Sequence, residues 1–284
     1  MMTRRDCLKA GAAALSMPAP AARKMNVRLG AMQGSLAAKP SPEMLALAKK
    51  LGLEGVELNI GRVLAGGKMP LSDAGLQQGY LAEARRLKLA IAGVVLDIFH
   101  VHPLKNDPAA PAFVPEGIAV ARAMNARVLL LPFFGKAALA NRDEMGRAAD
   151  ILKEHVKTAQ KAGIVMGLED TISAEDNAWM LDRVASPALK VYYDVGNLTN
   201  LGMDAPKEIR WLGGKRICQI HLKDKPYLGE GKVDLKECLR AVRDAGYQGF
   251  LNFETSAPSG DREADLRRNV EYTRKLLAEV QAEG

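Results

Sequence analysis

The sequence predicts an α/β fold in which eight parallel strands alternate with helices in a single (β/α)8 barrel. Eight short apolar runs recur along the chain and are separated by longer amphipathic stretches, which is the pattern of repeated strand–helix units. The repeat length is roughly 33 residues, as in one unit of such a barrel. A content of 48% hydrophobic and 26% charged residues is typical of a globular core and excludes a disordered or fibrous chain.

The predicted strands are short, rich in aliphatic residues and bounded by glycine, proline or charged positions. They cover residues 27–32, 55–58, 89–96, 128–131, 164–168, 190–193, 217–220 and 250–253. A doubly wound open sheet is the competing arrangement. It is disfavoured because Gly30 and Gly34, at the end of the first run, lack the G-x-G-x-x-G spacing of a dinucleotide-binding turn.

Helix signals lie between the strands. Ser41, Pro42 and Glu43 are typical of an N-cap, a first-turn proline and a first-turn acid. Asn141 is expected to open another helix, which ends at Gly163.

Residues 22–284 are predicted to form one barrel domain, because no Pro/Ser-rich linker interrupts residues 26–280. The least helical connection, residues 99–115, follows the third strand. It is longer than closing a turn requires, so we expect it to form part of a substrate rim.

Residues 1–21 have the features of a cleavable targeting segment. Arg4 and Arg5 precede a run of small residues, and an A-x-A-like cleavage signal ends at Ala21. The stretch resembles the twin-arginine export motif, from which it departs by Cys7 in place of a preferred Phe. The resemblance implies a periplasmic or secreted protein, whereas an ordinary basic N-terminus would imply a cytoplasmic one.

The net charge of +7 comes from 40 Lys and Arg against 33 Asp and Glu. Part of this excess belongs to the targeting segment, and the remaining basic residues are scattered among acids. Aromatic residues make up only 5%, so the basic–aromatic interleaving of single-strand binding is missing and no nucleic-acid partner is expected. No stretch approaches the roughly 20 apolar residues of a membrane-spanning helix, and no stable membrane anchor is expected.

Each of the last four predicted strands is followed directly by a residue that can bind a metal: Glu169, Asp194, His221 and Glu254. They are about one strand–helix repeat apart, so a barrel would bring them together where all its strands end. Three crowded carboxylates repel one another unless a cation lies between them. Three carboxylates and one imidazole suit a divalent ion, with Mn²⁺ as the first choice and Co²⁺, Mg²⁺, Fe²⁺ or Zn²⁺ as alternatives.

Short motifs surround these four residues. They read GLED at 167–170, YDVGN at 193–197, HLKD at 221–224 and NFE at 252–254. Over nearly all of residues 26–280 the chain resembles the xylose-isomerase-like TIM barrels, a superfamily of sugar isomerases, sugar phosphate isomerases and ketose 3-epimerases. The resemblance implies four metal ligands, Glu169, Asp194, His221 and Glu254. It also implies that Glu169 and Glu254 form an acid–base pair that works through an enediolate.

Five further residues are candidates for binding a substrate. Glu175 matches a substrate-contacting position of the ketose epimerases, or is simply a first-turn helix acid. Lys223 and Asn197 belong to the motifs, and Asn197 replaces a histidine of those epimerases. His102 lies near the end of the third strand, where it can reach sugar hydroxyls or remain an ordinary loop residue. Glu57, at the end of the second strand, can bond to the sugar or to a neighbouring lysine.

The leading interpretation is a metal-dependent isomerase or epimerase of a sugar or keto-sugar. The alternative is a lyase or dehydratase acting on keto-sugars or oxidised glycosides, favoured by Lys223 and Asp224, which resemble a branch that includes dehydratases. An endonuclease IV-like repair enzyme and a non-catalytic sugar-binding barrel rank lower. The expected partner is a small carbohydrate, unphosphorylated if the targeting segment is used, and relatives are usually homodimers or homotetramers.

Overall fold

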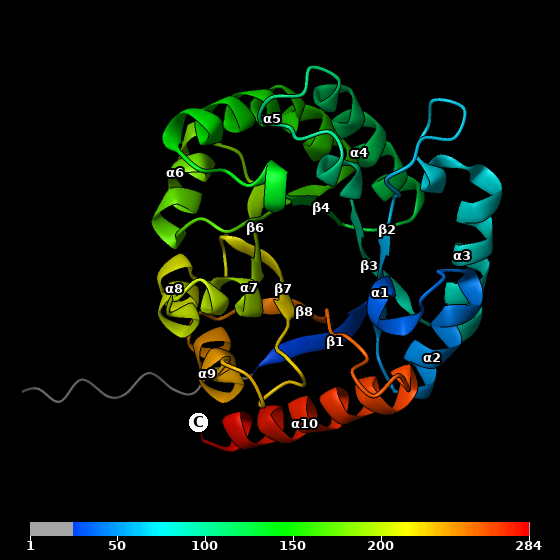
Figure 1. Ribbon diagram of the computed structural model, residues 1–284, viewed down its shortest axis with the longest axis vertical. Helices are drawn as coiled ribbons and strands as arrows, with labels where there is room; N and C mark the ends of the chain where they lie inside the picture. The colour runs from blue at the N-terminus through cyan, green and yellow to red at the C-terminus, as the bar shows by residue number, and fades with distance from the viewer. Residues whose placement is uncertain (1–24, 284) are drawn as a thin grey trace, which may run out of the picture.

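The computed structural model describes residues 25–283 (Figure 1), so the predicted targeting segment, residues 1–21, lies outside the described residues. Eight parallel strands close into a barrel in chain order, which confirms the (β/α)8 prediction. The strands are β1 Asn26–Met32, β2 Gly55–Asn59, β3 Ala90–Val95, β4 Val128–Pro132, β5 Val165–Glu169, β6 Leu189–Asp194, β7 Ile217–Leu222 and β8 Gln248–Phe253. Each predicted boundary lies within two residues of the observed one.

Closure of the barrel excludes the open-sheet alternative. β1 pairs with β8 from Asn26 opposite Gln248 to Ala31 opposite Phe253, and with β2 on its other side. Because the first and last strands of the chain pair with each other, the described sheet has no free edge.

Helices surround the barrel on the outside (Figure 1). They are α1 Gln33–Leu36, α2 Leu45–Lys50, α3 Ala74–Leu87, α4 Phe113–Ala123, α5 Arg142–Ala162, α6 Ala174–Val184, α7 Val195–Asn200, α8 Ala205–Leu212, α9 Leu235–Asp244 and α10 Arg262–Ala282. Single 3₁₀ turns are η1 Pro42–Met44, η2 Pro70–Ser72, η3 Asp97–His100, η4 Ala110–Ala112 and η5 Gly135–Ala137. Within the described residues, no helix has the length and apolar character needed to cross a bilayer.

The structure confirms the predicted N-cap at Asn141 but not the one at Ser41. Asn141 Oδ1 accepts from the backbone N–H groups of Asp143 and Glu144 at 3.1 and 3.0 Å, and α5 ends at Gly163 with φ 72°. At Ser41 the expected side-chain cap is absent from the described structure. Met44 N donates instead to Ser41 O at 3.2 Å, so the first turn is a tighter 3₁₀ turn before α2.

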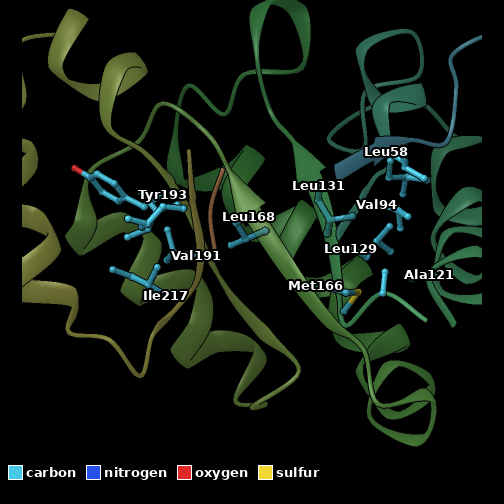
Figure 2. Close-up of a cluster of buried hydrophobic side chains, with 14 of the residues drawn as sticks. Leu58, Val94, Ala121, Leu129, Leu131, Met166, Leu168, Val191, Tyr193 and Ile217 are labelled. Atoms are coloured by element: carbon cyan, nitrogen blue, oxygen red, sulfur yellow. The ribbon is translucent and has the colours of Figure 1, made fainter. Parts of the chain in front are cut away.

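Successive side chains along each strand point alternately out of the barrel and into its interior. Outward side chains pack against the helices in the main apolar core, part of which Figure 2 shows. Its labelled members are Leu58, Val94, Ala121, Leu129, Leu131, Met166, Leu168, Val191, Tyr193 and Ile217. The neighbouring residues Glu57, Glu169, Tyr192 and Asp194 therefore face the barrel interior.

Candidate metal centre

The barrel brings Glu169, Asp194, His221 and Glu254 together. Glu169 and Asp194 are the last residues of β5 and β6, His221 is the last but one of β7, and Glu254 follows β8 directly. One possible ligand atom from each lies within 4.8 Å of those from the other three. The cluster contains three carboxylates and one imidazole, so the residues expected to converge do so.

One ring nitrogen of His221 faces the cluster. Its Nδ1 lies 2.7 Å from Glu169 Oε1, 3.4 Å from Glu254 Oε2 and 3.9 Å from Asp194 Oδ2. The His221 side chain is fully buried. A cation bound among the carboxylates would therefore meet Nδ1 rather than Nε2.

Asp194 carries the clearest sign that the cluster suits a cation. Its Oδ1 accepts from Asn197 N at 2.7 Å and caps α7. Its Oδ2 is buried and has no hydrogen-bond partner among the described residues. A buried carboxylate oxygen without a partner is costly, and a divalent ion bound by this oxygen-rich donor set would offset that cost.

Lys223 supplies a positive charge beside the carboxylates. Its Nζ lies 2.8 Å from Glu254 Oε2 and 3.6 Å from Asp194 Oδ2. Burial works against its charged form, but Glu254 and Asp194 outweigh burial and raise the pKa of Lys223. The ammonium group thus neutralises part of the cluster's negative charge.

The acids of the cluster titrate unequally. Burial raises the pKa of Asp194 to about 8, although Lys223 lowers it, and burial also raises the pKa of Glu169. For Glu254, burial is outweighed by His221 and Lys223, and its pKa falls. For His221, burial is outweighed by Glu169 and Glu57, and its pKa rises well above the usual value. Without a metal the cluster therefore holds protons that a cation would displace.

A cavity opens beside Glu254 at the carboxyl ends of β1, β7 and β8. Its volume is about 240 Å³, and its lining includes Met32, Ser35, Lys223, Glu254 and Ser256. Glu254 is 28% exposed, so a molecule in the cavity can reach its carboxylate. The cavity lies at the end of the barrel where such folds build their active sites.

The other predicted substrate contacts lie in different surroundings. Glu57 is fully buried, and its Oε2 lies 2.8 Å from His221 Nε2. Asn197 is in α7, next to Asp194. Glu175 is exposed in the first turn of α6. His102 is 31% exposed in the loop after β3, with Nδ1 2.8 Å from Asp107 Oδ2. Contact between these residues and a substrate stays a prediction.

Two features of the site were not anticipated from the sequence. Tyr192, Gln219 and Asn252 are hydrogen-bonded to one another inside the barrel, below the cluster. The signal in the sequence that could have revealed them was a polar residue at a strand position whose side chain points inward. Asp224 accepts from the backbone N–H groups of four residues, Lys225, Gly231, Lys232 and Val233, and so fixes the loop that follows His221 and Lys223.

Fold and cluster together define a (β/α)8 barrel with a candidate metal centre at the carboxyl ends of its strands. The chain belongs to the xylose isomerase-like TIM barrel family, whose model matches residues 45–276. This confirms the family resemblance carried by the four motifs.

Relatives and solved structures agree with this assignment. The chain is 28% identical over 264 residues to 2-epi-5-epi-valiolone 7-phosphate 2-epimerase of Actinoplanes sp., covering 88% of this chain and 95% of the relative. It is 26% identical over 269 residues to L-ribulose-5-phosphate 3-epimerase of Escherichia coli, covering 84% and 90%. Both relatives are epimerases and therefore isomerases.

The fold itself matches solved epimerase structures. An L-ribulose 3-epimerase aligns with a TM-score of 0.75 at 16% identity, covering 90% of this chain and 96% of that one. D-Allulose 3-epimerase from Methylomonas sp. in complex with D-allulose aligns with a TM-score of 0.70 at 15% identity, covering 89% and 98%. These structures show that the barrel is shared.

Proposed function

We propose that the protein is a metal-dependent isomerase or epimerase of a sugar or keto-sugar. The observation that carries the proposal is the convergence of Glu169, Asp194, His221 and Glu254 around the buried Oδ2 of Asp194, which accepts no hydrogen bond from the described residues. The epimerase relatives support the same reaction class.

These four residues would hold one divalent ion, with Mn²⁺ as the first choice. Bound there, the ion would supply Lewis-acid polarisation of a substrate carbonyl, which acidifies the neighbouring C–H. The chain's own contribution is the fixed donor set, with Asp194 held by Asn197 N and His221 held between Glu169 and Glu57.

Glu169 and Glu254 are suited to move the proton. They come from β5 and β8, separate parts of the barrel wall, and both approach His221 Nδ1. One carboxylate would take the proton next to the carbonyl to give an enediolate, and the other would return a proton from the opposite face of the sugar. Despite burial, His221 and Lys223 lower the pKa of Glu254, so this carboxylate is ionised and can begin as the base.

The remaining predicted contacts would orient the substrate. Lys223 lines the cavity and lies beside Glu254, so its ammonium group can donate to a substrate oxygen. Asn197, Glu175 and His102 are on α7, on α6 and in the loop after β3, elements that follow the strands' carboxyl ends.

Lys223 also favours one alternative reaction, elimination by a lyase or dehydratase. An ammonium group 2.8 Å from Glu254 can give a proton to a departing oxygen. The two reactions share the first deprotonation and differ in whether the enediolate is reprotonated or expels a group.

Proton exchange in D₂O tests the proposal. Metal-loaded protein is incubated with free ketoses, ketose phosphates and 3-keto-glycosides, and exchange is followed by NMR. Epimerisation places deuterium in an intact sugar, whereas elimination releases water or a fragment. Glu169→Gln and Glu254→Gln should slow exchange by about 10²- to 10⁴-fold. Exchange as fast in these variants as in the wild type would contradict the assignment.

Glu116→Gln is a matched control. Glu116 is a partly buried glutamate that accepts from Met69 N and Ser72 Oγ, outside the cluster. This variant should exchange at the wild-type rate.

We further propose that the protein is exported through its twin-arginine-like segment and that it assembles as a homodimer or homotetramer. Export would favour unphosphorylated substrates, whereas both relatives are named for phosphorylated substrates. The substrate panel therefore contains both classes, and size-exclusion chromatography with light scattering measures the assembly.

A further inference from the structure

Glu57 reaches across the barrel interior to the imidazole of His221. It belongs to β2, whereas His221 belongs to β7, and 164 residues separate them in the sequence. Its Oε2 lies 2.8 Å from His221 Nε2, and both side chains are 0% exposed. This contact is within 0.1 Å of the 2.7 Å contact between His221 Nδ1 and Glu169, but it is on the opposite side of the ring.

The imidazole stands between Glu57 and the candidate metal ligands. Nδ1 faces Glu169, Asp194 and Glu254, and Nε2 faces Glu57. Glu57 is also absent from the lining of the cavity beside Glu254. A molecule in that cavity therefore meets the cluster before it could meet Glu57, which leaves the imidazole as the group that Glu57 serves.

We propose that Glu57 is a positioning residue that accepts a hydrogen bond from His221 Nε2 and so presents Nδ1 to the metal. A histidine ligand holds its metal best when its other nitrogen donates to a fixed acceptor, because this sets both the tautomer and the plane of the ring. The inference rests on the proposed metal-dependent function and adds to it a residue that is not itself a ligand.

A polar layer below the cluster holds this arrangement in place. The Tyr192 ring lies against His221, with centroids 4.5 Å apart and planes tilted by 54°. Asn252 Nδ2 donates to Tyr192 Oη and to Gln219 Oε1, both at 2.8 Å, and Gln219 Nε2 donates to Ala92 O at 2.6 Å. His221 is therefore confined by Glu57 along the ring plane and by Tyr192 on one face.

Glycine at position 93 leaves room for the Glu57 carboxylate. Gly93 pairs with Glu57 between β3 and β2. A Cβ on Gly93 would lie 3.1 Å from Glu57 Oε1 and 3.6 Å from Gln219 Oε1. A side chain there would crowd the carboxylate from the neighbouring strand, so the sequence at 93 is consistent with a carboxylate held at this place.

Packing alone does not account for Glu57. A fully buried carboxylate is costly unless it is paired. Its Oε1 has no hydrogen-bond partner among the described residues. The contact between Oε2 and His221 is therefore the hydrogen bond that the carboxylate makes within the described structure. The cost is explained if the carboxylate is needed to orient the imidazole.

Metal affinity of the full-length protein tests the role. Mn²⁺ binding is measured by calorimetry, and the visible spectrum of the Co²⁺ form reports the ligand geometry. Glu57→Gln should weaken Mn²⁺ binding by about 10- to 100-fold and change the Co²⁺ spectrum. Glu57→Asp keeps the charge with a shorter reach and should recover part of the affinity. Unchanged affinity and spectrum in Glu57→Gln would overturn the proposal.

Two controls separate this proposal from others. Glu116→Gln, outside the cluster, should leave Mn²⁺ binding and the Co²⁺ spectrum unchanged. The ¹H–¹⁵N NMR signals of the His221 ring report the contact without metal: a protected Nε2–H is expected in the wild type and should shift in Glu57→Gln. If the wild type binds no divalent metal, the proposed function fails, and identical His221 signals in both proteins would then overturn the Glu57 contact separately. Should Glu57→Gln not fold, Glu57→Asp is compared with the wild type: weaker Mn²⁺ binding is expected, because the shorter side chain draws the carboxylate away from Nε2, and wild-type affinity would overturn the proposal.

Discussion

Lys223 Nζ lies 2.8 Å from Glu254 Oε2, so the lysine of the HLKD motif is an internal counter-ion to a predicted metal ligand. The same ammonium group lies 3.6 Å from Asp194 Oδ2. A divalent ion and Lys223 would neutralise the same carboxylates, and the response of the protein to metal should depend on this lysine.

Lys223→Met should destabilise the metal-free protein, because Glu254 and Asp194 lose their nearby ammonium group. Both Lys223 and Glu254 are about one-quarter exposed, so the loss should be about 1–3 kcal/mol, between the values for surface and buried pairs. Mn²⁺ should then raise the melting temperature of the variant more than that of the wild type. Scanning fluorimetry with and without Mn²⁺ measures both, and equal increases would argue against a shared role.

Metal affinity should rise with pH. Without metal the pKa of Asp194 is about 8 and that of His221 lies well above its usual value, so a bound cation must displace protons. Affinity should change by about tenfold per pH unit for each proton displaced. Calorimetry in buffers of different ionisation enthalpy counts the protons, and an affinity that is flat between pH 6 and 8 would contradict the proposed ligands.

The stability of the metal-free protein should show the opposite trend. Asp194 and His221 both have pKa values raised by folding, so the folded state binds more protons than the unfolded chain. Stabilisation from Asp194 is complete below its unfolded pKa of about 4 and is lost as pH rises towards 8. For His221 the loss begins near its unfolded pKa of about 6.5. Urea unfolding between pH 6 and 8 should give falling stability without metal, and a smaller fall or a reversal with Mn²⁺.

Gly30→Ala should destabilise the barrel where β1 meets β8. A Cβ at Gly30 would lie 2.2 Å from Asn252 Oδ1 and 3.1 Å from Gly55 O, so the polar layer under the cluster would have to move. The expected loss is about 1–3 kcal/mol, measured by thermal or urea unfolding. Gly34→Ala is the matched control, because a Cβ there has no neighbour within 4 Å. Equal stability of the two variants would contradict the close approach.

Replacing Arg4 and Arg5 by lysine should retain the protein in the cytoplasm, if residues 1–21 act as a twin-arginine signal. The prediction is tested by cell fractionation and by mass spectrometry of the mature N-terminus in an export-competent host. Periplasmic protein in the wild type and its loss in the double lysine variant are expected. Equal distribution of both proteins would remove the export proposal.

The sequence predicted the barrel and the convergent cluster because both follow from local patterns. Each strand is an apolar run, and Glu169, Asp194, His221 and Glu254 each stand where such a run ends. The contact between Glu57 and His221 has no such pattern, since it crosses the barrel between residues 164 positions apart. The sequence placed Glu57 at a strand end, but only the closed barrel shows which ring it touches.

Polar residues inside the strands were also hard to interpret. Tyr192, Gln219 and Asn252 share inward strand positions, yet their mutual hydrogen bonds depend on the barrel radius and on register. The register shifts between β6 and β7, next to Tyr192. The sequence does not reveal such a local irregularity, although it determines which side chains contact one another.

The start of β1 at Asn26 has a consequence for maturation. Asn26 lies opposite Gln248, the first residue of β8, at the amino ends of the strands, whereas the cluster lies at their carboxyl ends. The polypeptide that precedes Asn26 therefore joins the barrel at the pole away from the cavity. The proposed removal of residues 1–21 would therefore take away no residue of the cluster and none that lines the cavity beside Glu254.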